Sequence, residues 1–204
     1  MTELRLRVES HDVIGIVETW ATNSINDAEL AIEGYNMFRA DRMTCKGGGL
    51  IMYIHEKLKS FLCNDMMNTN FKESLWCVIE AEEGKFLIGL CYRSTSSNAS
   101  NDESLLKLLQ KTADKRGISH FMIMSDFNLP HIDYEHSMVR AGPNTAASRF
   151  FEETLDLFLV QHVHAVTRYR AAQEPSMLDY IFTGEEKLIE NMKVGQPLGK
   201  SDHV

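Results

Sequence analysis

The sequence has no excess of positive charge, no long apolar run and few prolines. Its 21 Lys and Arg residues are outnumbered by 29 Asp and Glu residues, which gives a formal net charge of −8. This balance excludes a general electrostatic attraction to nucleic acid or to anionic membranes. A role on nucleic acid would therefore need a local basic patch or a metal ion to offset phosphate repulsion. No apolar segment approaches the ~18 residues of a membrane span, and we expect neither a membrane helix nor a signal peptide.

The four cysteines, Cys45, Cys63, Cys77 and Cys91, lack the Cys-x-x-Cys spacing of zinc and redox motifs. Two of them lie within predicted strands, so buried thiols in a reducing compartment are a better interpretation than a disulfide framework. The chain has 204 residues, of which 4 are proline, 12 are glycine and 44% are hydrophobic. This composition excludes a fibrous or disordered chain, and we expect one globular domain, residues 1–204, without a repeat or a linker.

Short apolar runs alternate with amphipathic segments along the chain, which is typical of a mixed α/β fold. Strands are predicted at residues 13–17, 35–39, 50–54, 75–81, 86–92, 121–124, 160–166 and 178–182, with 189–194 as a further candidate. Helices are predicted at 1–12, at 23–32, from a cap at Asn101 to Gly117, and at 146–158 with Asn144 as its cap. The 75–81 and 86–92 strands are expected to form a hairpin. We therefore expect a mixed sheet, or two packed sheets, flanked by helices.

Two local patterns resemble ligand-binding motifs but have a better structural explanation. Gly47-Gly48-Gly49 resembles a phosphate-binding loop, but neither Lys-Ser nor Lys-Thr follows and no helix is predicted there. Close backbone packing at the start of a strand is the better explanation. The spacing of Phe150, Phe151, Leu155 and Phe158 predicts the core-facing side of a helix and requires no cofactor.

The strand at 121–124 continues into Ser125-Asp126-Phe127-Asn128. Because side chains alternate along an extended chain, Asp126 and Asn128 are expected to face one site together. Other polar residues lie at or near the ends of predicted strands or turns: Glu18, Tyr92, Asp179, Asp202 and His203. Each has an ordinary explanation as a solvated strand end or an exposed terminal residue.

Together these residues suit phosphodiester hydrolysis. Mg²⁺ prefers one or two carboxylates plus water and phosphate oxygens, and Glu18 is the best candidate ligand. Asp126 can orient or activate the attacking water, and a histidine held by a carboxylate, here His203 by Asp179, can donate to the phosphate. Asn128 and Tyr92 would then place the phosphate by hydrogen bonds.

The order of these motifs resembles that of the endonuclease/exonuclease/phosphatase superfamily. It is most similar to the apurinic-type endonuclease domains of LINE-like, jockey-type non-LTR retrotransposons. The motifs that carry the resemblance are Glu18-Thr19-Trp20, Asp41-Arg42, Tyr92-Arg93, Ser125-Asp126-Phe127-Asn128, Thr167-Arg168, Leu178-Asp179-Tyr180 and Ser201-Asp202-His203.

The resemblance implies a four-layer α/β sandwich and a metal-dependent endonuclease that nicks DNA with Mg²⁺ or Mn²⁺ as cofactor. The nick would leave a 3′-hydroxyl for a reverse transcriptase domain of a longer parent protein, and the location would be intracellular, nuclear if the domain is functional. The implied metal residues are Glu18 and Asp202, and the implied DNA contacts are Arg93, Thr167 and Arg168. The implied catalytic residues are Tyr92, Asp126, Asn128, Asp179 and His203.

Three departures from the family pattern leave alternatives open. The family begins with a strand that ends in an Asn and closes with a strand after Ser-Asp-His, and we expect neither within residues 1–204, as in a domain truncated at both ends. Tyr92-Arg93-Ser94-Thr95 lacks the family's prolines, and Ser125 replaces its usual Gly. One alternative is an inactive remnant or binding module of the same fold. The other is a phosphatase or phospholipase of the superfamily, which the Thr167-Arg168 and Tyr92-Arg93 motifs disfavour.

Overall fold

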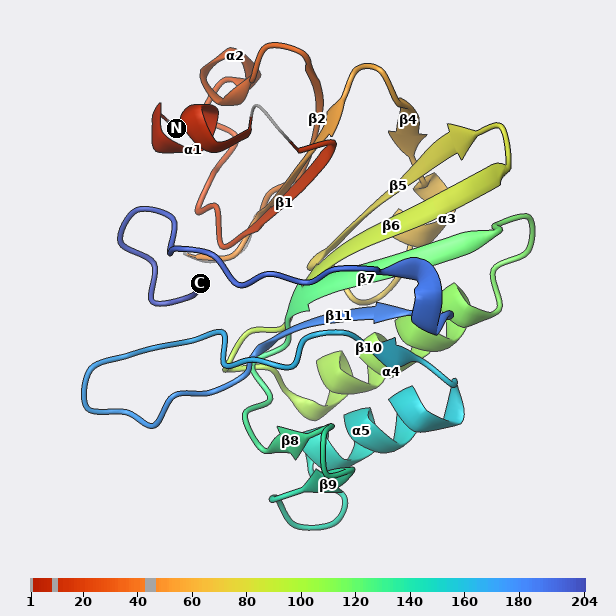
Figure 1. Cartoon of the computed structure of the whole chain (residues 1–204), viewed down its shortest axis with the longest axis vertical. Coiled ribbons are helices and arrows are strands. Elements are labelled where there is room, and N and C mark those ends of the chain that lie inside the picture. Colours follow the sequence, from red (N-terminus) through yellow and green to blue (C-terminus); the bar gives the residue numbers. More distant parts are fainter. Residues whose placement is uncertain (1, 9–10, 43–46) are drawn as a thin grey trace.

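The computed structural model describes residues 2–8, 11–42 and 47–204 and contains two packed β-sheets (Figure 1). The smaller sheet is antiparallel and has the order β1-β3-β2, with strands Val13–Val17, Leu50–His55 and Tyr35–Ala40. The larger has the order β10-β11-β7-β6-β5-β4. Its strands are Val160–Gln161, Asp179–Thr183, His120–Asp126, Gly84–Tyr92, Ser74–Ala81 and Lys59–Leu62. Among the described strands, β6 and β7 form the one parallel pair, and helix α4 (Ala99–Ala113) connects them.

Helices cover the outer faces of both sheets. Helices α1 (Thr2–Arg7) and α2 (Asp27–Leu30) lie over the smaller sheet, and α4 and α5 (Ala146–Asp156) lie over the larger one (Figure 1). Helix α3 (Asn64–Met67) follows β4, a hairpin of β8 (Ile132–Asp133) and β9 (Met138–Val139) precedes α5, and a 3-10 helix, η2, spans Glu186–Leu188.

Alternation along the strands separates the apolar side chains into layers. In β3, Ile51 and Tyr53 face α1 and α2, whereas Leu50, Met52 and Ile54 face the larger sheet. In β5 and β6 the side chains that do not join the inter-sheet cluster pack beneath α4 and α5 instead. The result is a helix–sheet–sheet–helix arrangement, and it confirms the predicted class of two packed sheets flanked by helices.

The predicted hairpin is confirmed, since β5 and β6 pair antiparallel from Ser74↔Cys91 to Ala81↔Gly84. The predicted strand at 160–166 was too long, because only Val160 and Gln161 pair with β11. The candidate strand at 189–194 was wrong, since these residues form no strand. Strand β4 and the β8–β9 hairpin were not predicted. Strands β8 and β9 have only two residues each, which is too short for an alternating pattern to show.

Both long helices begin at other caps than those predicted. Helix α4 begins after Asn98, whose side chain accepts from the Asn101 N–H at 2.9 Å, so Asn101 lies within the first turn. Helix α5 begins after Thr145 rather than Asn144. The prediction that Phe158 belongs to the core was also wrong. The helix ends at Asp156, Phe158 adopts a left-handed backbone conformation with φ 53°, and its side chain is 85% exposed. Leu155 on the same helix is exposed as well.

The cysteines within the described residues, Cys63, Cys77 and Cys91, are buried free thiols, as predicted. Burial raises the pKa of Cys77 to about 12, so this thiol stays protonated at neutral pH. Cys45 lies outside the described residues. No helix in the described ranges is long and apolar enough to span a membrane.

Gly89 on β6 is required by packing and not by its backbone angle. A Cβ at this position would overlap the ring of Trp76, which is fully buried on the neighbouring strand β5. We expect Gly89→Ala to lower the free energy of unfolding by about 1–3 kcal/mol, the usual cost of overpacking a core. Urea denaturation measures this. Gly195→Ala is the matched control, because a Cβ there has nothing within 4 Å. Equal midpoints for the two variants would contradict the packing explanation.

Candidate active site

Three adjacent strands place Tyr92, Asp126 and Asp179 in line at one edge of the larger sheet. Strand β7 ends at Asp126, which pairs in register with Tyr92 of β6 on one side and with Asp179 of β11 on the other. Neighbouring strands lie ~4.8 Å apart, so the three side chains leave the sheet at one place. Asp126 is buried, and Asp179 is half-buried.

His203 joins this row from the last residues of the chain. Its Nδ1 lies 2.8 Å from an oxygen of Asp179, so the ring donates to that carboxylate, and its Nε2 lies 4.0 Å from Asp126. Residues 202–204 run beside 167–169. The Tyr169 N–H donates to the Asp202 carbonyl at 2.8 Å, and the Val204 N–H donates to the Thr167 carbonyl at 2.9 Å. This pairing holds the histidine over the sheet edge.

Thr167 fixes the other end of the same contact. Its side chain is buried, and its hydroxyl oxygen accepts from the N–H groups of Leu178 and Asp179, both at 3.1 Å. Thr167 therefore fixes the backbone of Asp179 and, through Asp179, the orientation of His203. The predicted contact between Thr167 and the DNA backbone receives no support from it.

The close contact of Asp126, Asp179 and His203 raises the pKa of both Asp126 and His203. Burial, and then the charge of Asp179, raises the pKa of Asp126 to about 7. The hydrogen bond with Asp179 raises the pKa of His203, which favours an imidazolium paired with a carboxylate. A carboxyl group that titrates near neutrality beside a charged histidine is suited to proton transfer at neutral pH.

Glu18 and Tyr92 form the second part of the site. The Tyr92 hydroxyl donates to a carboxylate oxygen of Glu18. Burial and this hydrogen bond raise the pKa of Tyr92, so its hydroxyl remains a donor. Glu18 follows β1, is exposed, and has a left-handed backbone conformation with φ 54°. The pKa values of both Tyr92 and Asp126 are raised by the charge of Glu18, so the two halves of the site interact.

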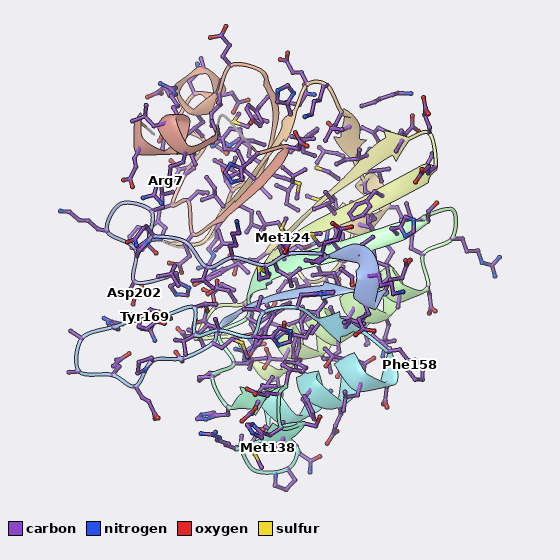
Figure 2. The ribbon with its side chains drawn as sticks, viewed as in Figure 1. Arg7, Met124, Met138, Phe158, Tyr169 and Asp202 are labelled. Carbon is purple, nitrogen blue, oxygen red and sulfur yellow. The ribbon has the colours of Figure 1, made fainter. Side chains whose placement is uncertain are left out.

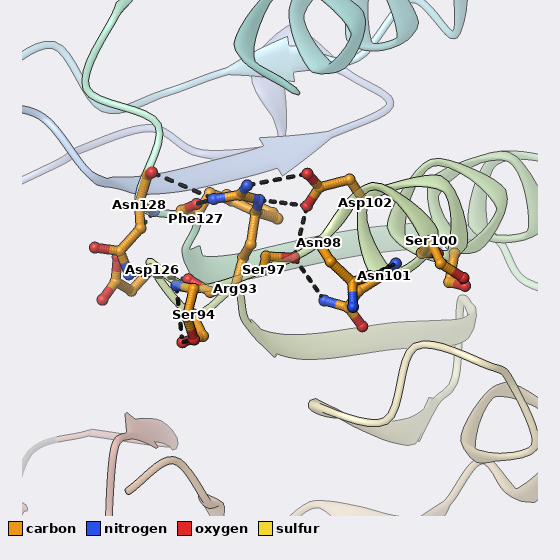
Figure 3. A network of polar contacts seen from close by, with 12 residues as sticks. Arg93, Ser94, Ser97, Asn98, Ser100, Asn101, Asp102, Asp126, Phe127 and Asn128 are labelled. Atoms are coloured by element: carbon orange, nitrogen blue, oxygen red, sulfur yellow. Dashed lines mark hydrogen bonds and ion pairs between the residues drawn. The ribbon is translucent and has the colours of Figure 1, made fainter. Parts of the chain in front are cut away.

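Arg93 and Asn128 connect the site to α4 (Figure 3). The Arg93 guanidinium donates to Asp102 at 2.7 and 3.1 Å, and the residue is only 6% exposed. Its position supports a structural role and gives no support to the predicted DNA contact. The Asn128 side-chain amide donates to the Arg93 carbonyl at 2.9 Å, and its backbone N–H donates to Asp126 at 3.1 Å.

The alternation argument for Asp126 and Asn128 was wrong in its physical basis. The strand ends at Asp126, and Asn128 has φ 51°, so the chain has already left the extended conformation. The two residues are brought together by a hydrogen bond and a turn, not by the pleat of a strand.

Asp202 and Arg168 lie on the neighbouring loops, where Figure 2 labels Asp202 close to Tyr169. The Arg168 Nε donates to Asp202 at 3.1 Å. Burial alone would raise the pKa of Asp202, but this hydrogen bond and the charge of Arg168 lower it. Arg168, predicted to contact DNA, and Asp202, predicted to lie near the metal, therefore neutralise each other's charge in this structure.

The donor set fits a hard divalent cation at Glu18. Its carboxylate is exposed, it has a hydroxyl partner in Tyr92, and its charge acts on the neighbouring Asp126. Mg²⁺ needs only one or two protein carboxylates, with water and phosphate completing its shell. Single ligand atoms of Asp126, Asp179 and His203 also lie within 4.8 Å of one another. Because Nδ1 of His203 already donates to Asp179, we interpret that group as a hydrogen-bonded triad.

Comparison with known proteins assigns the chain to a family. The family model described as "Endonuclease-reverse transcriptase" matches residues 86–204, more than half of the chain. The chain belongs to this family. It is a retrotransposon-type member of the endonuclease/exonuclease/phosphatase superfamily, as the order of its motifs predicted. No curated protein sequence matches it significantly.

Solved structures share the fold at low sequence identity. The endonuclease domain of TRAS1, a telomere-specific non-LTR retrotransposon, superposes with a TM-score of 0.71 at 14% identity, over 99% of this chain and 88% of that one. The AP endonuclease LMAP of Leishmania major gives 0.65 at 16% identity, over 89% and 73%. The human Nocturnin catalytic domain gives 0.61 at 16% identity, over 100% and 82%.

Of the ten predicted site residues, the structure brings five directly together: Glu18, Tyr92, Asp126, Asp179 and His203. Three more contact these five or their neighbours by hydrogen bonds: Asn128, Thr167 and Arg93. The last two, Asp202 and Arg168, pair with each other on adjacent loops. Sequence reasoning missed two ion-pair partners: Asp102, which pairs with Arg93, and Glu73, which pairs with Arg42.

The Arg93–Asp102 ion pair predicts a pH-dependent contribution to stability. The two side chains are 8% and 15% exposed, and removing one partner of a buried pair costs about 3–5 kcal/mol, which we expect for Asp102→Ala at pH 7. Burial opposes ionisation of Asp102, but the hydrogen bonds from Arg93 and Ser97 prevail and lower its pKa. The contribution is therefore complete above the unfolded-state pKa of ~4 and is lost as the pH falls through the lower folded-state value.

Urea denaturation of wild type and Asp102→Ala from pH 7 to pH 3 measures this difference. Asp65→Ala is the matched control, because Asp65 also pairs with cations but its side chain is 62% exposed. We expect that control to cost much less than Asp102→Ala, because solvent screens an exposed ion pair. A difference between wild type and Asp102→Ala that stays constant down to pH 3 would exclude the ion pair as its source.

Proposed function

We propose that this protein is a metal-dependent endonuclease that nicks DNA, in the manner of a retrotransposon endonuclease. Family membership and the shared fold support phosphodiester hydrolysis as the kind of reaction. The observation that carries the finer proposal is the row of Tyr92, Asp126 and Asp179 with His203 above it, opposite an exposed carboxylate at Glu18.

The side chains divide the work between the attacking water and the phosphate. Asp126, with its pKa raised to about 7, orients the water and accepts its proton as the water oxygen bonds to phosphorus. The bond from phosphorus to the 3′-oxygen breaks, and that oxygen takes up a proton from solvent to become the 3′-hydroxyl. The imidazolium of His203 donates from Nε2 to a phosphate oxygen while Asp179 holds Nδ1, which stabilises the charge that develops. The hydroxyl of Tyr92 donates to the same phosphate or to Glu18.

Glu18 would hold Mg²⁺ or Mn²⁺. A divalent cation bound there would supply positive charge to polarise the scissile phosphate. Asp202 is the second acidic residue that we assign to the neighbourhood of the metal, and release from Arg168 would make its carboxylate available.

The biological setting follows from the same proposal. A nick that leaves a 3′-hydroxyl would prime a reverse transcriptase domain of a longer parent protein, and an enzyme that cuts chromosomal DNA acts in the nucleus. Two other functions compete with this one: a binding module of the same fold without catalysis, and hydrolysis of lipid or inositol phosphates. The name "mannosyl-6-phosphatase" of one structural neighbour from Bacteroides thetaiotaomicron shows that a phosphatase shares the fold.

Nicking of supercoiled plasmid tests the proposal. We expect conversion to the open-circular form with Mg²⁺ or Mn²⁺ and none with chelator. Asp126→Ala and His203→Ala should each lose about 10²–10⁴-fold in rate, the usual contribution of a general acid or base. His136→Ala is the matched control, because His136 also lies against an aspartate, Asp133, but on the exposed β8–β9 loop.

Each competing function has its own outcome in this assay. Nicking that survives both Asp126→Ala and His203→Ala would reject the site. A chain that binds plasmid with the same affinity in both variants but never cuts it would favour the binding module. Release of phosphate from inositol phosphates without nicking would favour the phosphatase.

A further inference from the structure

Two motifs of the sequence have no role in the proposed chemistry: Arg42 and the glycine run Gly47-Gly48-Gly49. The structure places both beside Glu18 and Tyr92. The Arg42 Nε donates to Glu73 at 2.8 Å, and a second guanidinium nitrogen donates to the other carboxylate oxygen. The two side chains are 15% and 20% exposed. Such a two-point contact fixes the plane of the guanidinium as well as its place.

This ion pair holds Tyr92 at two points. The guanidinium carbon of Arg42 lies 5.5 Å from the centre of the Tyr92 ring, a cation–π distance. The Tyr92 N–H donates to the backbone carbonyl of Glu73 at 2.9 Å. The Arg42–Glu73 pair thus holds both the ring and the backbone of Tyr92. The hydroxyl of the same ring donates to Glu18.

The glycine run holds the backbone of the Glu18 turn. The carbonyls of Gly49 and Gly48 accept from the N–H groups of Thr19 and Trp20, at 3.2 and 2.9 Å. Glu18 and Trp20 both have φ 54°, a conformation that is unfavourable in residues other than glycine and persists only where the surroundings impose it.

Gly48 also connects the glycine run to the ion pair. Its φ is +68°, and a Cβ there would lie 2.6 Å from Cζ of Arg42 and would overlap the Glu73 carboxylate. The loop therefore passes directly over the pair. One contiguous group of residues fixes the backbone of Glu18 from one side and the ring of Tyr92 from the other.

We propose that Arg42 and Glu73 are positioning residues that set the Tyr92 hydroxyl against the Glu18 carboxylate. The effect on nicking rests on the proposed function, whereas the effect on the Tyr92 ring does not. The simpler explanation is a structural ion pair, and it predicts a loss of stability with no specific effect at Tyr92. Replacement of the guanidinium by an ammonium separates the two, because Lys keeps the charge but loses the planar two-point contact.

Fluorine NMR of protein labelled with 3-fluorotyrosine tests the position of the ring without metal or DNA. The sequence has six tyrosines, and Tyr92→Phe identifies the Tyr92 signal by its loss. We expect Arg42→Lys and Glu73→Gln to shift or broaden that signal and to leave the other five unchanged. Arg39→Lys is the matched control, because Arg39 is 16% exposed and pairs with Asp41 and Asp27 instead. A Tyr92 signal that is unchanged in Arg42→Lys overturns the inference.

Nicking kinetics test the consequence for the reaction. We expect Arg42→Lys to lower kcat about tenfold or more with KM for plasmid unchanged, since small displacements of reacting groups carry large costs in rate. In a Tyr92→Phe background the same substitution should have almost no effect, because residues that act through one another are not additive. Additive effects overturn the inference and leave the proposed function intact. A fluorine signal that changes as expected in a chain that never nicks DNA rejects the proposed function and retains the inference.

Discussion

The pairing of β7 with β6 on one side and β11 on the other is the constraint on which the site depends. It sets Tyr92, Asp126 and Asp179 in one row, and every other functional side chain is arranged around that row. A shift of one residue in either ladder would turn a carboxylate to the opposite face of the sheet, so the register cannot vary without loss of the site. The next residue after Asp126 secures this register. Phe127 is fully buried and packs against Phe150, Tyr180 and Phe182 beneath the helices.

The same arrangement concentrates negative charge at a place where it is costly. Asp126 is buried beside Asp179, and burial and the charge of Asp179 both disfavour its ionisation. His203 offsets part of this cost, because it lies against both carboxylates and carries a raised pKa. The histidine is held by main-chain pairing of residues 202–204 with 167–169, so a contact between segments far apart in the sequence stabilises the charge at the strand ends. Buried charge that the surroundings must compensate is common where catalysis requires a shifted pKa.

The fold was largely predictable because alternation and apolar runs report burial directly. The long strands and both main helices follow from such patterns, and so does the hairpin of β5 and β6. The β8–β9 hairpin was not predicted and β10 was predicted too long, since elements of two paired residues leave no periodic signal. Phe158 was misplaced for a different reason: its spacing suits the core face, but the helix ends two residues earlier and the chain turns outward.

For the candidate site, the sequence predicted several residues that the structure brings together, but not their contacts. Strand ends and family motifs identified Glu18, Tyr92, Asp126, Asp179 and His203, which do lie together. The same reasoning assigned Arg93 and Thr167 to the DNA. In the structure both are buried: Arg93 pairs with Asp102, and the Thr167 hydroxyl accepts from the Asp179 N–H. Hydrogen bonds between residues distant in sequence decide this difference, and a single sequence does not encode them in any local pattern. Glu73 shows the limit most clearly, because its importance comes entirely from what it touches.

The distribution of charge at this edge of the sheet gives a physical reason for the proposed metal. The formal net charge of the chain is −8, so approach to a phosphodiester is unfavourable overall. The arginines around the site do not correct this locally, because Arg42, Arg93 and Arg168 are engaged by Glu73, Asp102 and Asp202. Each pair is close to neutral, and among the described residues the exposed carboxylate of Glu18 adds negative charge beside Asp126. In the proposed reaction, a cation bound at Glu18 would add its positive charge to that of the His203 imidazolium and so favour the approach of the phosphate.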